Sequence, residues 1–322
     1  MNRAALALLS LTAVALPFLA SDYVVVLALR ALMYSLIVMS FGLLAGQLGL
    51  VSLLQSTFAG ISGYGVAILS TRHGWSAGPA ALASLVLTLA SAAVFGLISL
   101  KAAGVGFMML TIALGQMVWA LSLQWIDLFK GMDGIVSIPT PALAGFDLRD
   151  PRAMYAVTVV VVAASFGSAH VLIQSRLGLL MRGIQDNAPR MRALGHPVLR
   201  ARLAGFLLAS LYAGLGGILL TWETRVITPV TLDLSRAVWV LTAAVIGGTT
   251  LGGSAIGVVI MVALEAVLSQ YTDRHVLVFG VILALAILLL PNGIAAYAAD
   301  LRAKRRGRTR GPTVLQLSRA RE

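Results

Sequence analysis

Ser62 is the residue in this sequence whose neighbours most resemble those of a catalytic nucleophile. It lies in Gly60-Ile61-Ser62-Gly63, a Gly-x-Ser-Gly pattern that would suit an intramembrane serine protease. A serine nucleophile needs a histidine within hydrogen-bond reach. The only histidine in a predicted membrane span is His170, and at 1.5 Å of rise per residue its depth differs from that of Ser62 by about 15 Å. The sequence therefore predicts no such dyad, and the glycines indicate close helix packing instead.

The residues needed for cysteine chemistry, metal binding or ATP hydrolysis are absent from the sequence or lack the required spacing. The chain has no cysteine, which excludes disulfides, thiolate catalysis and cysteine metal sites. No His-Glu-x-x-His motif occurs, and His73, His196 and His275 lie in predicted loops without metal-ligand spacing. No Gly-x-x-x-x-Gly-Lys-[Ser/Thr] string occurs, so the chain has no P-loop of its own. We predict a protein that is not an enzyme and holds no metal or cofactor.

A charged block at residues 175–202 contains six arginines and one aspartate within an otherwise apolar chain. Its apolar residues recur every three or four positions, which predicts a helix. Pro189 cannot lie inside a helix without loss of a hydrogen bond, so the helix should divide there. Asn187 suits an N-cap, Pro189 a first turn and Gly195 a stop, which predicts a short helix over about 188–195. Such a helix either lies on anionic lipid through its arginines or docks a partner in the cytosol.

Two charged residues, Arg30 and Glu265, fall within predicted spans. An unpaired charge at the centre of a membrane helix costs about 2.5–3.5 kcal/mol. Counted from the outer ends of their spans, their depths differ by about 3 Å. We hypothesise that they pair or border the same wet cavity; the alternative is that Arg30 reaches the interface while Glu265 is satisfied separately.

Further polar residues in or next to the third span, and in a long outer loop, are candidates for a pathway. The polar residues in or next to the third span serve either as pathway residues or as helix-packing contacts. Asp133 and Gly134 either shape a vestibule, meet a partner protein that delivers the solute, or form a plain turn. The candidates of the span are Gln47, Gln55, Ser56 and Thr57.

The composition is that of a membrane protein, with 59% hydrophobic and 11% charged residues, whereas a soluble domain carries about 25% charged residues. Apolar runs of membrane-spanning length recur along the chain. We predict an all-α polytopic membrane protein with about ten transmembrane helices over residues 1–300, and a basic cytoplasmic tail over 301–322. The spans are about 4–20, 23–44, 48–70, 78–100, 103–125, 153–173, 203–221, 237–249, 254–270 and 276–291.

The distribution of charge sets the orientation. With both termini in the cytoplasm, the inner segments hold sixteen basic and three acidic residues, whereas the outer ones hold seven and eight. This matches the positive-inside rule. The net charge of +12 is therefore explained by the membrane and anionic lipid, and no nucleic acid partner is expected.

Two further segments stand out. The eighth and ninth spans are short and meet at the glycine-rich string IGGTTLGGSAIG. Such a string marks either discontinuous helices beside a transport path or a tight turn between tilted helices. The outer loop at about 126–152 is long enough to form a small structured cap.

Five strings follow one another in a fixed order: GQLGLVSLLQSTFAGISGYG (46–65), GVGFMMLTIALGQ (104–116), GMDGIVSIP (131–139), RGIQDNAPRMRALGHPVLRARLAGF (182–206) and LLLPNGI (288–294). From about residue 42 to 294 the sequence thereby resembles the LivM-type permease subunits of branched-chain amino acid ABC importers. It departs from them at Leu54, where glycine is usual, and at Asn292, where arginine is usual. Of the Glu-Ala-Ala coupling motif chiefly Gly195 remains.

The resemblance implies an importer of the bacterial inner membrane. A periplasmic binding protein would deliver leucine, isoleucine or valine. Two homologous permease subunits would form an alternating-access path, and two ATPase subunits, which use ATP and Mg, would drive it. The block at 175–202 would then be a cytoplasmic coupling helix that fits a groove on one ATPase. The residues implied in coupling are Arg182, Asp186, Asn187, Pro189, Arg190, Arg192 and Gly195.

Two other transporters remain as alternatives. An ion-coupled secondary transporter would need no ATPase, but it would leave the 175–202 block unexplained. An ABC permease for urea, other amino acids or small carboxylates would keep the same architecture with a different solute.

Overall fold

The computed structural model describes residues 22–143, 146–268 and 280–281, and apart from one pair of two-residue strands its regular elements are helices. Its long helices are α2 (Asp22–Leu48), α3 (Gln55–Arg72), α4 (Ala77–Ser99), α5 (Val105–Gln124), α7 (Pro151–Gln174), α8 (Arg176–Ala193), α9 (Val198–Thr224), α10 (Leu234–Gly247) and α11 (Leu251–Leu268). The short elements are α6 (Ile126–Phe129), η1 (Gly131–Asp133), β1 (Ala142–Leu143), β2 (Phe146–Asp147) and η2 (Pro229–Leu232).

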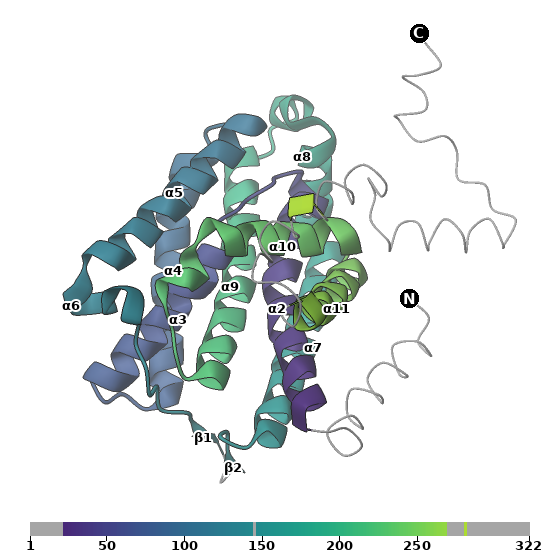
Figure 1. Ribbon diagram of the computed structural model, residues 1–322. Coiled ribbons are helices and arrows are strands. Elements are labelled where there is room, and N and C mark those ends of the chain that lie inside the picture. The colour runs from purple at the N-terminus through teal and green to yellow at the C-terminus, as the bar shows by residue number, and fades with distance from the viewer. Residues whose placement is uncertain (1–21, 144–145, 269–279, 282–322) are drawn as a thin grey trace, which may run out of the picture.

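The bundle is built around α9, which packs on α2, α3 and α4 (Figure 1). Three glycines of α9 face these three neighbouring helices, one glycine for each helix. A Cβ at Gly216 would lie 2.8 Å from the Ile37 side chain of α2, one at Gly217 would overlap the Ala59 carbonyl of α3, and one at Gly214 would lie 3.1 Å from Leu85 of α4. Small residues let membrane helices approach closely enough for backbone contact. The absence of these side chains thus sets the spacing of the bundle.

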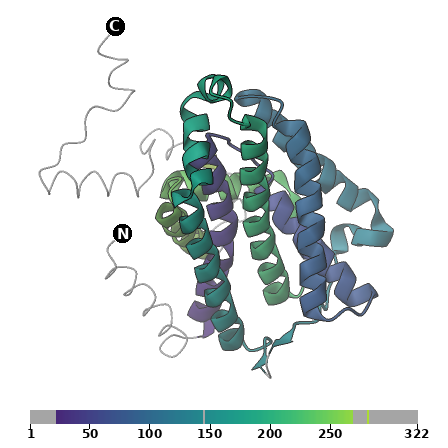
Figure 2. The ribbon, with the colours of Figure 1, turned by 180° about the vertical axis from the view of Figure 1, so that it is seen from behind.

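Aromatic side chains fill the centre of the bundle. Phe206 of α9 meets Phe58 of α3 edge to face, with ring centroids 5.6 Å apart, and Phe107 of α5 at 6.4 Å. All three side chains are buried. Figure 2, seen from behind, shows α9 between α7 and α4. The core therefore runs along α9.

The membrane spans agree in part with the prediction. Among the described residues, five helices are long and apolar enough to cross a membrane, namely α2, α4, α5, α7 and α9, and α10 with α11 pass the same test only together, as a bent pair. All-helical architecture is therefore confirmed for the described residues. The predicted spans at 4–20 and 276–291 and the tail at 301–322 lie outside the described residues.

The third predicted span, 48–70, is wrong at its start. Gly49 adopts a positive φ of 65°, which ends α2, and α3 begins only at Gln55. The amide of Leu50 donates to the Leu44 carbonyl at 3.2 Å, and that of Leu53 to Thr111 Oγ1 at 3.4 Å. The apolar run continues through residues 49–54, where these amides find partners outside a regular helix, so hydropathy alone placed the helix start too early.

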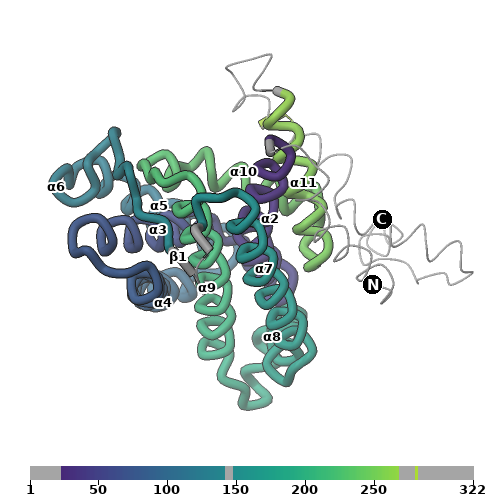
Figure 3. Tube along the Cα trace, turned by 90° about the horizontal axis from the view of Figure 1, so that it is seen from below, coloured from purple at the N-terminus to yellow at the C-terminus, as the bar shows by residue number. Residues whose placement is uncertain are grey.

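The α10–α11 pair is bent by 119° at its break. Helix α10 ends at Gly247, Gly248 follows with φ 92°, and α11 starts at Leu251. In Figure 1, α10 runs across the bundle rather than along it, and Figure 3 shows α11 beside α2. The glycine-rich string thus covers the end of α10, a sharp turn at Gly248–Thr250 and the start of α11, within one bent helix pair.

The bundle has two distinct ends. The α8 end carries α8, the end of α2 and the loop between α4 and α5, and the opposite end, here the β end, carries β1 and β2 (Figure 1). At the β end, Ile135 and Ile227 exchange backbone hydrogen bonds of 2.9 Å, and Gly134 packs on the Ile227 backbone with φ 67°. Segments predicted to share one side of the membrane, 174–202 and 101–102 among them, lie together at the α8 end.

Ser62 has a structural role. Its Oγ is fully buried and lies 2.8 Å from the carbonyl oxygens of Ala59 and Gly214, so it joins α3 to α9. His170 instead contacts Gln174, with 2.9 Å between Nε2 atoms, and lines a separate cavity. The glycine neighbours of Ser62, Gly60 and Gly63, pack against side chains of the 221–232 region, as close packing requires.

We expect Gly217→Ala to destabilise the protein by about 1–3 kcal/mol, because its Cβ meets the backbone of α3, which has no free space to retreat into. Gly167→Ala on α7 is the matched control: nothing lies within 4 Å of its Cβ, and alanine favours a helix over glycine. Thermal unfolding of both variants in detergent measures the difference. Equal stability of the two variants would contradict the role of Gly217.

Candidate functional site

A cavity of about 680 Å³, here cavity 1, lies among α2, α3, α9, α10, α11 and the segment before α10. Its volume falls in the range of ligand sites, about 300–1,000 Å³. Its walls combine apolar and charged side chains. The apolar ones include Leu27, Ile37, Leu220, Val240 and Val262, and the polar ones include Arg30, Tyr34, Ser56, Glu223, Arg236 and Glu265.

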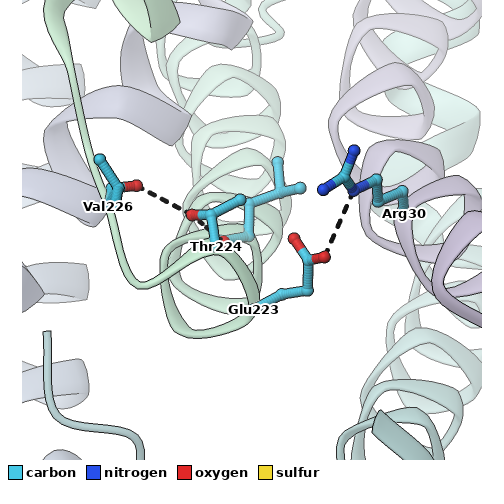
Figure 4. A network of polar contacts seen from close by, with 5 residues as sticks. Arg30, Glu223, Thr224 and Val226 are labelled. Carbon is cyan, nitrogen blue, oxygen red and sulfur yellow. Dashed lines mark hydrogen bonds and ion pairs between the residues drawn. The ribbon is translucent and has the colours of Figure 1, made fainter. Parts of the chain in front are cut away.

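Among the described residues, two ion pairs line cavity 1. Arg30 Nε donates to Glu223 Oε1 at 3.3 Å (Figure 4), and Arg236 Nη1 lies 3.5 Å from Glu265 Oε1. Arg30 and Glu265 therefore do not pair with each other, and each has a partner that the sequence analysis placed in an outer loop. They nevertheless border the same cavity, which was the other arrangement considered.

Helices α2 and α9 position the Arg30–Glu223 pair. Arg30 and Tyr34 are one turn apart on α2 and both line the cavity. Glu223 lies in the last turn of α9, and Arg225 caps the end of this helix in a left-handed conformation with φ 54°. Thr224 Oγ1 lies 2.8 Å from the carbonyl oxygens of Leu220 and Val226 and holds the reversal (Figure 4). The chain then folds back over the cavity.

The second pair depends on the start of α10. Asp233 caps this helix by accepting from the amides of Leu234 at 2.7 Å and Ser235 at 3.4 Å. The cap fixes the first turn, which carries Arg236. Glu265 projects from the far part of α11. Both partners thus belong to the α10–α11 pair, whereas Arg30 and Glu223 belong to α2 and α9.

Several polar atoms on cavity 1 are left without a partner. The Glu223 side chain is only 11% exposed, and its Oε2 has no hydrogen bond within the described residues. The same holds for the buried Ser56 Oγ. Arg30 contacts Glu223 through Nε alone among the described residues, and its side chain is 51% exposed. A buried acceptor without a donor costs about 1–3 kcal/mol. A ligand with a cationic donor, an anionic group and an apolar part would therefore complement this site.

Of the six candidate pathway residues, three line cavity 1: Arg30, Ser56 and Glu265. The other three lie elsewhere. Gln47 is at the α8 end, Gln55 is buried with Oε1 accepting from Ser40 Oγ at 2.9 Å, and Thr57 is buried toward Gly115 of α5. The polar residues that open α3 thus point to different neighbours.

Helix α8 contains the break expected near Pro189. Asn187 leaves the helical region with φ −159° and ψ 90°, and its Oδ1 accepts from the Arg190 amide at 2.9 Å. Asn187 therefore caps a second helical piece, with Pro189 in its first turn, where a missing N–H costs nothing. This piece ends at Ala193, slightly before the predicted 195, and Gly195 follows with φ 83°.

The two halves of α8 differ in burial. In the first half Met181 and Ile184 are each 1% exposed and anchor the helix in the core. Arg182 Nε donates to Gln47 Oε1 at 2.9 Å. The remaining predicted coupling residues are exposed on the α8 end: Asp186, Asn187, Pro189, Arg190, Arg192 and Gly195.

Sequence reasoning missed Glu223 and Arg236 as cavity residues. The predicted spans ended at 221 and began at 237, which left both residues in loops. Asp233 followed by an apolar run is an N-cap signal that would have extended α10 back over Arg236. No comparable signal marks Glu223. Within the described residues, no group of three or more His, Asp or Glu side chains suits a metal ion.

The comparisons with known proteins agree on one family. The family described as the permease component of branched-chain amino acid transport systems matches residues 23–290. The high-affinity branched-chain amino acid transport system permease protein LivM of Salmonella typhimurium is 25% identical over 312 residues, which cover 88% of this chain and 72% of LivM. LivM of Escherichia coli is 24% identical with the same coverage.

A further relative covers about half of the chain, and solved structures add nothing. The probable branched-chain amino acid transport permease protein LivH of Methanocaldococcus jannaschii is 26% identical over 149 residues, 45% of this chain and 47% of LivH. No solved structure matches the chain.

A charge exchange tests the pairing in cavity 1. We expect Arg30→Glu or Glu223→Arg alone to lower stability by about 1–3 kcal/mol, because each opposes like charges. The double exchange of Arg30 and Glu223 should recover much of this loss. Exchange of Arg30 and Glu265 is the control and should not recover it, since it places like charges opposite Glu223 and opposite Arg236. Thermal unfolding of the five proteins, wild type included, decides between the two pairings.

Proposed function

Because the chain belongs to the family of permease components of branched-chain amino acid transport systems, we propose that cavity 1 is its half of an alternating-access path for a branched-chain amino acid. The chain is a permease subunit of an ABC importer. The observation that carries the proposal is the Arg30–Glu223 pair, which leaves one buried carboxylate oxygen without a hydrogen-bond partner among the described residues, beside apolar walls.

The chemistry of cavity 1 suits a zwitterion with an aliphatic side chain. The free Glu223 Oε2 accepts from an ammonium group, and the terminal nitrogens of Arg30 donate to a carboxylate. Charge-assisted hydrogen bonds of this kind are worth about 1.5–3 kcal/mol. Leu220, Val240 and Val262 give the aliphatic part an apolar surface. Urea has no charge to match either group, so this site favours an amino acid over urea.

The exposed half of α8 is proposed as the docking helix for an ATPase subunit. Its arginines project from the α8 end, and its first half is anchored by Met181 and Ile184. The break at Asn187 separates the two halves of α8, and the anchored half ties the exposed half to the core of the bundle. The ATPases would bind ATP and Mg, since this chain has no P-loop.

The proposed assembly contains this chain, a homologous second permease, two ATPase subunits and a periplasmic binding protein in the bacterial inner membrane. The α8 end then faces the cytoplasm and the β end faces the periplasm. That orientation agrees with the positive charge of the 175–202 block. This chain contributes no bond chemistry, and its work is to expose cavity 1 to one side and then the other.

Co-purification tests the docking helix. We expect ATPase subunits from the same genome to co-purify with the wild-type chain and its sister permease, and to be lost with Arg190→Glu/Arg192→Glu. Arg72→Glu is the control, because Arg72 is equally exposed but ends α3 away from α8. Retention of the ATPase by the α8 variant would exclude this helix as the dock. Failure of the wild-type chain to bind any ATPase would favour a secondary transporter.

Uptake into proteoliposomes that hold the complete transporter tests the solute. We expect Glu223→Gln to lower leucine uptake by about tenfold to a hundredfold, because the amide cannot accept from an ammonium as a carboxylate does. Asp127→Asn, at the exposed α6, is the control. Leucine uptake unchanged by Glu223→Gln would exclude the carboxylate as the ammonium acceptor, and uptake of urea by the wild type would exclude the amino acid assignment.

A further inference from the structure

Helix α8 is fastened to the end of α2. Arg182 Nε bonds Gln47 Oε1 at 2.9 Å, and Arg182 Nη2 lies 3.4 Å from the Ile173 carbonyl of α7. A Cβ at Gly49, which follows α2, would lie 3.3 Å from the Gln185 side chain of α8. Movement of α8 is therefore passed to the last turns of α2.

The same turns of α2 also contact the break between α10 and α11. Gly42 and Gly46 are one turn apart, and both face Thr249. A Cβ at Gly46 would lie 2.7 Å from the Thr249 carbonyl oxygen, and one at Gly42 would lie 3.4 Å from it. The turn Gly248–Thr250, here the Thr249 turn, thus rests on bare α2 backbone.

Close glycine contacts lock α10 to α11 next to this turn. Cβ atoms at Gly247 and Gly257 would overlap the backbones of Gly253 and Ala243, respectively. A capping bond from the Gly253 amide to Thr250 Oγ1, at 3.0 Å, fixes the start of α11. Backbones in such contact cannot slide independently, so the two helices move as one rigid body.

The far parts of this rigid body form one side of cavity 1. Arg236 comes from the first turn of α10 and Glu265 from the last turn of α11, and their ion pair joins the two ends. Val240 and Val262 line the same side. A tilt of the α10–α11 pair about the Thr249 turn would therefore move this wall against Arg30 and Glu223.

A second cavity gives the Thr249 turn room to move. This cavity 2, of about 320 Å³, is bounded by the turn (Thr249, Thr250, Leu251), by the end of α2, and by His170, Ile173 and Arg182 of α7 and α8. Among the described helices, α10 and α11 pack chiefly on each other and on α2 rather than on α7 or α8. Figure 3 shows the pair next to α2. Within the described residues, the turn is thus supported on one face by α2 and borders cavity 2 on the other.

We propose that Thr249 is a positioning residue for transport: its contact with Gly42 and Gly46 passes movement of α8 to the α10–α11 pair, which swings the Arg236–Glu265 wall of cavity 1. Cavity 2 is the space that the Thr249 turn enters and leaves in each cycle. The inference rests on the proposed function in that α8 receives the movement and cavity 1 holds the solute. It adds the route between them.

Cross-linking across cavity 2 tests the movement. The chain has no cysteine of its own, so His170→Cys/Thr250→Cys can be bridged by a reducible bifunctional thiol reagent in the complete transporter with cysteine-free partners. We expect the bridge yield to differ by about fivefold or more between nucleotide-free and ATP-trapped transporters, the lower end of ordinary coupling between sites. This readout needs no solute.

The bridge should also separate ATP hydrolysis from uptake. With the Thr249 turn tethered, we expect uptake to fall about tenfold or more while ATP hydrolysis continues, and reduction of the bridge should restore uptake. The control is Leu82→Cys/Val86→Cys, one turn apart on the exposed face of α4, whose bridge crosses no moving boundary. Equal yields in both nucleotide states together with normal uptake by the bridged protein would overturn the proposal.

A second variant acts without a bridge. Gly46→Ala places a methyl group against the Thr249 carbonyl and should raise the ATP consumed per solute about fivefold or more. Gly167→Ala, which meets nothing within 4 Å, should leave this ratio unchanged. An unchanged ratio in Gly46→Ala would also count against the route. If the wild type fails to accumulate any branched-chain amino acid, the proposed solute is wrong, whereas a nucleotide-dependent bridge yield would still support the route.

Discussion

The structure depends on the absence of three side chains on one helix. Gly214 and Gly216 leave room for side chains of α4 and α2, and Gly217 lets α9 reach the backbone of α3, so one helix sets the separation of three others. In lipid, helix association gains nothing from hydrophobic burial and relies on such close packing. The same spacing brings the last turn of α9 opposite the first turns of α2, where Glu223 meets Arg30. The charged cavity is therefore a consequence of how closely the glycines allow the helices to approach.

The sequence predicted the features that depend on local chemistry. Asn187, Pro189 and Gly195 act as cap, first-turn residue and stop, because capping is decided within a few residues. The sequence could not predict which side chains pair with each other across the bundle. Depth along a span brought Arg30 and Glu265 within about 3 Å of one level, but depth does not say which helices are neighbours. Lateral order follows from glycine contacts such as Gly216 with Met33 and Ile37, and these match residues far apart in the chain.

The two ion pairs lie on two walls of cavity 1, and these walls belong to different sets of helices. Arg30 and Glu223 stand on α2 and α9, whose long mutual contact is part of the core. Arg236 and Glu265 stand on α10 and α11, which are locked to each other. Each pair is neutral by itself, so the walls can separate without breaking an ion pair. A change in the width of cavity 1 then costs only apolar contact and hydration, whereas a direct Arg30–Glu265 bond would have to break in every cycle.

This division also explains why the glycines fall into two groups. Those of α9 meet backbone or core side chains and leave no space, which suits a fixed scaffold. Gly42 and Gly46 present a smooth surface beside cavity 2, where the Thr249 turn has backbone on one face and open volume on the other. A tightly packed interface holds its two helices in one position. An interface of small residues beside a cavity allows the turn that rests on it to take a second position. Because interfaces switch between discrete arrangements rather than deform continuously, a small displacement of α8 is enough to select between two positions of the α10–α11 pair.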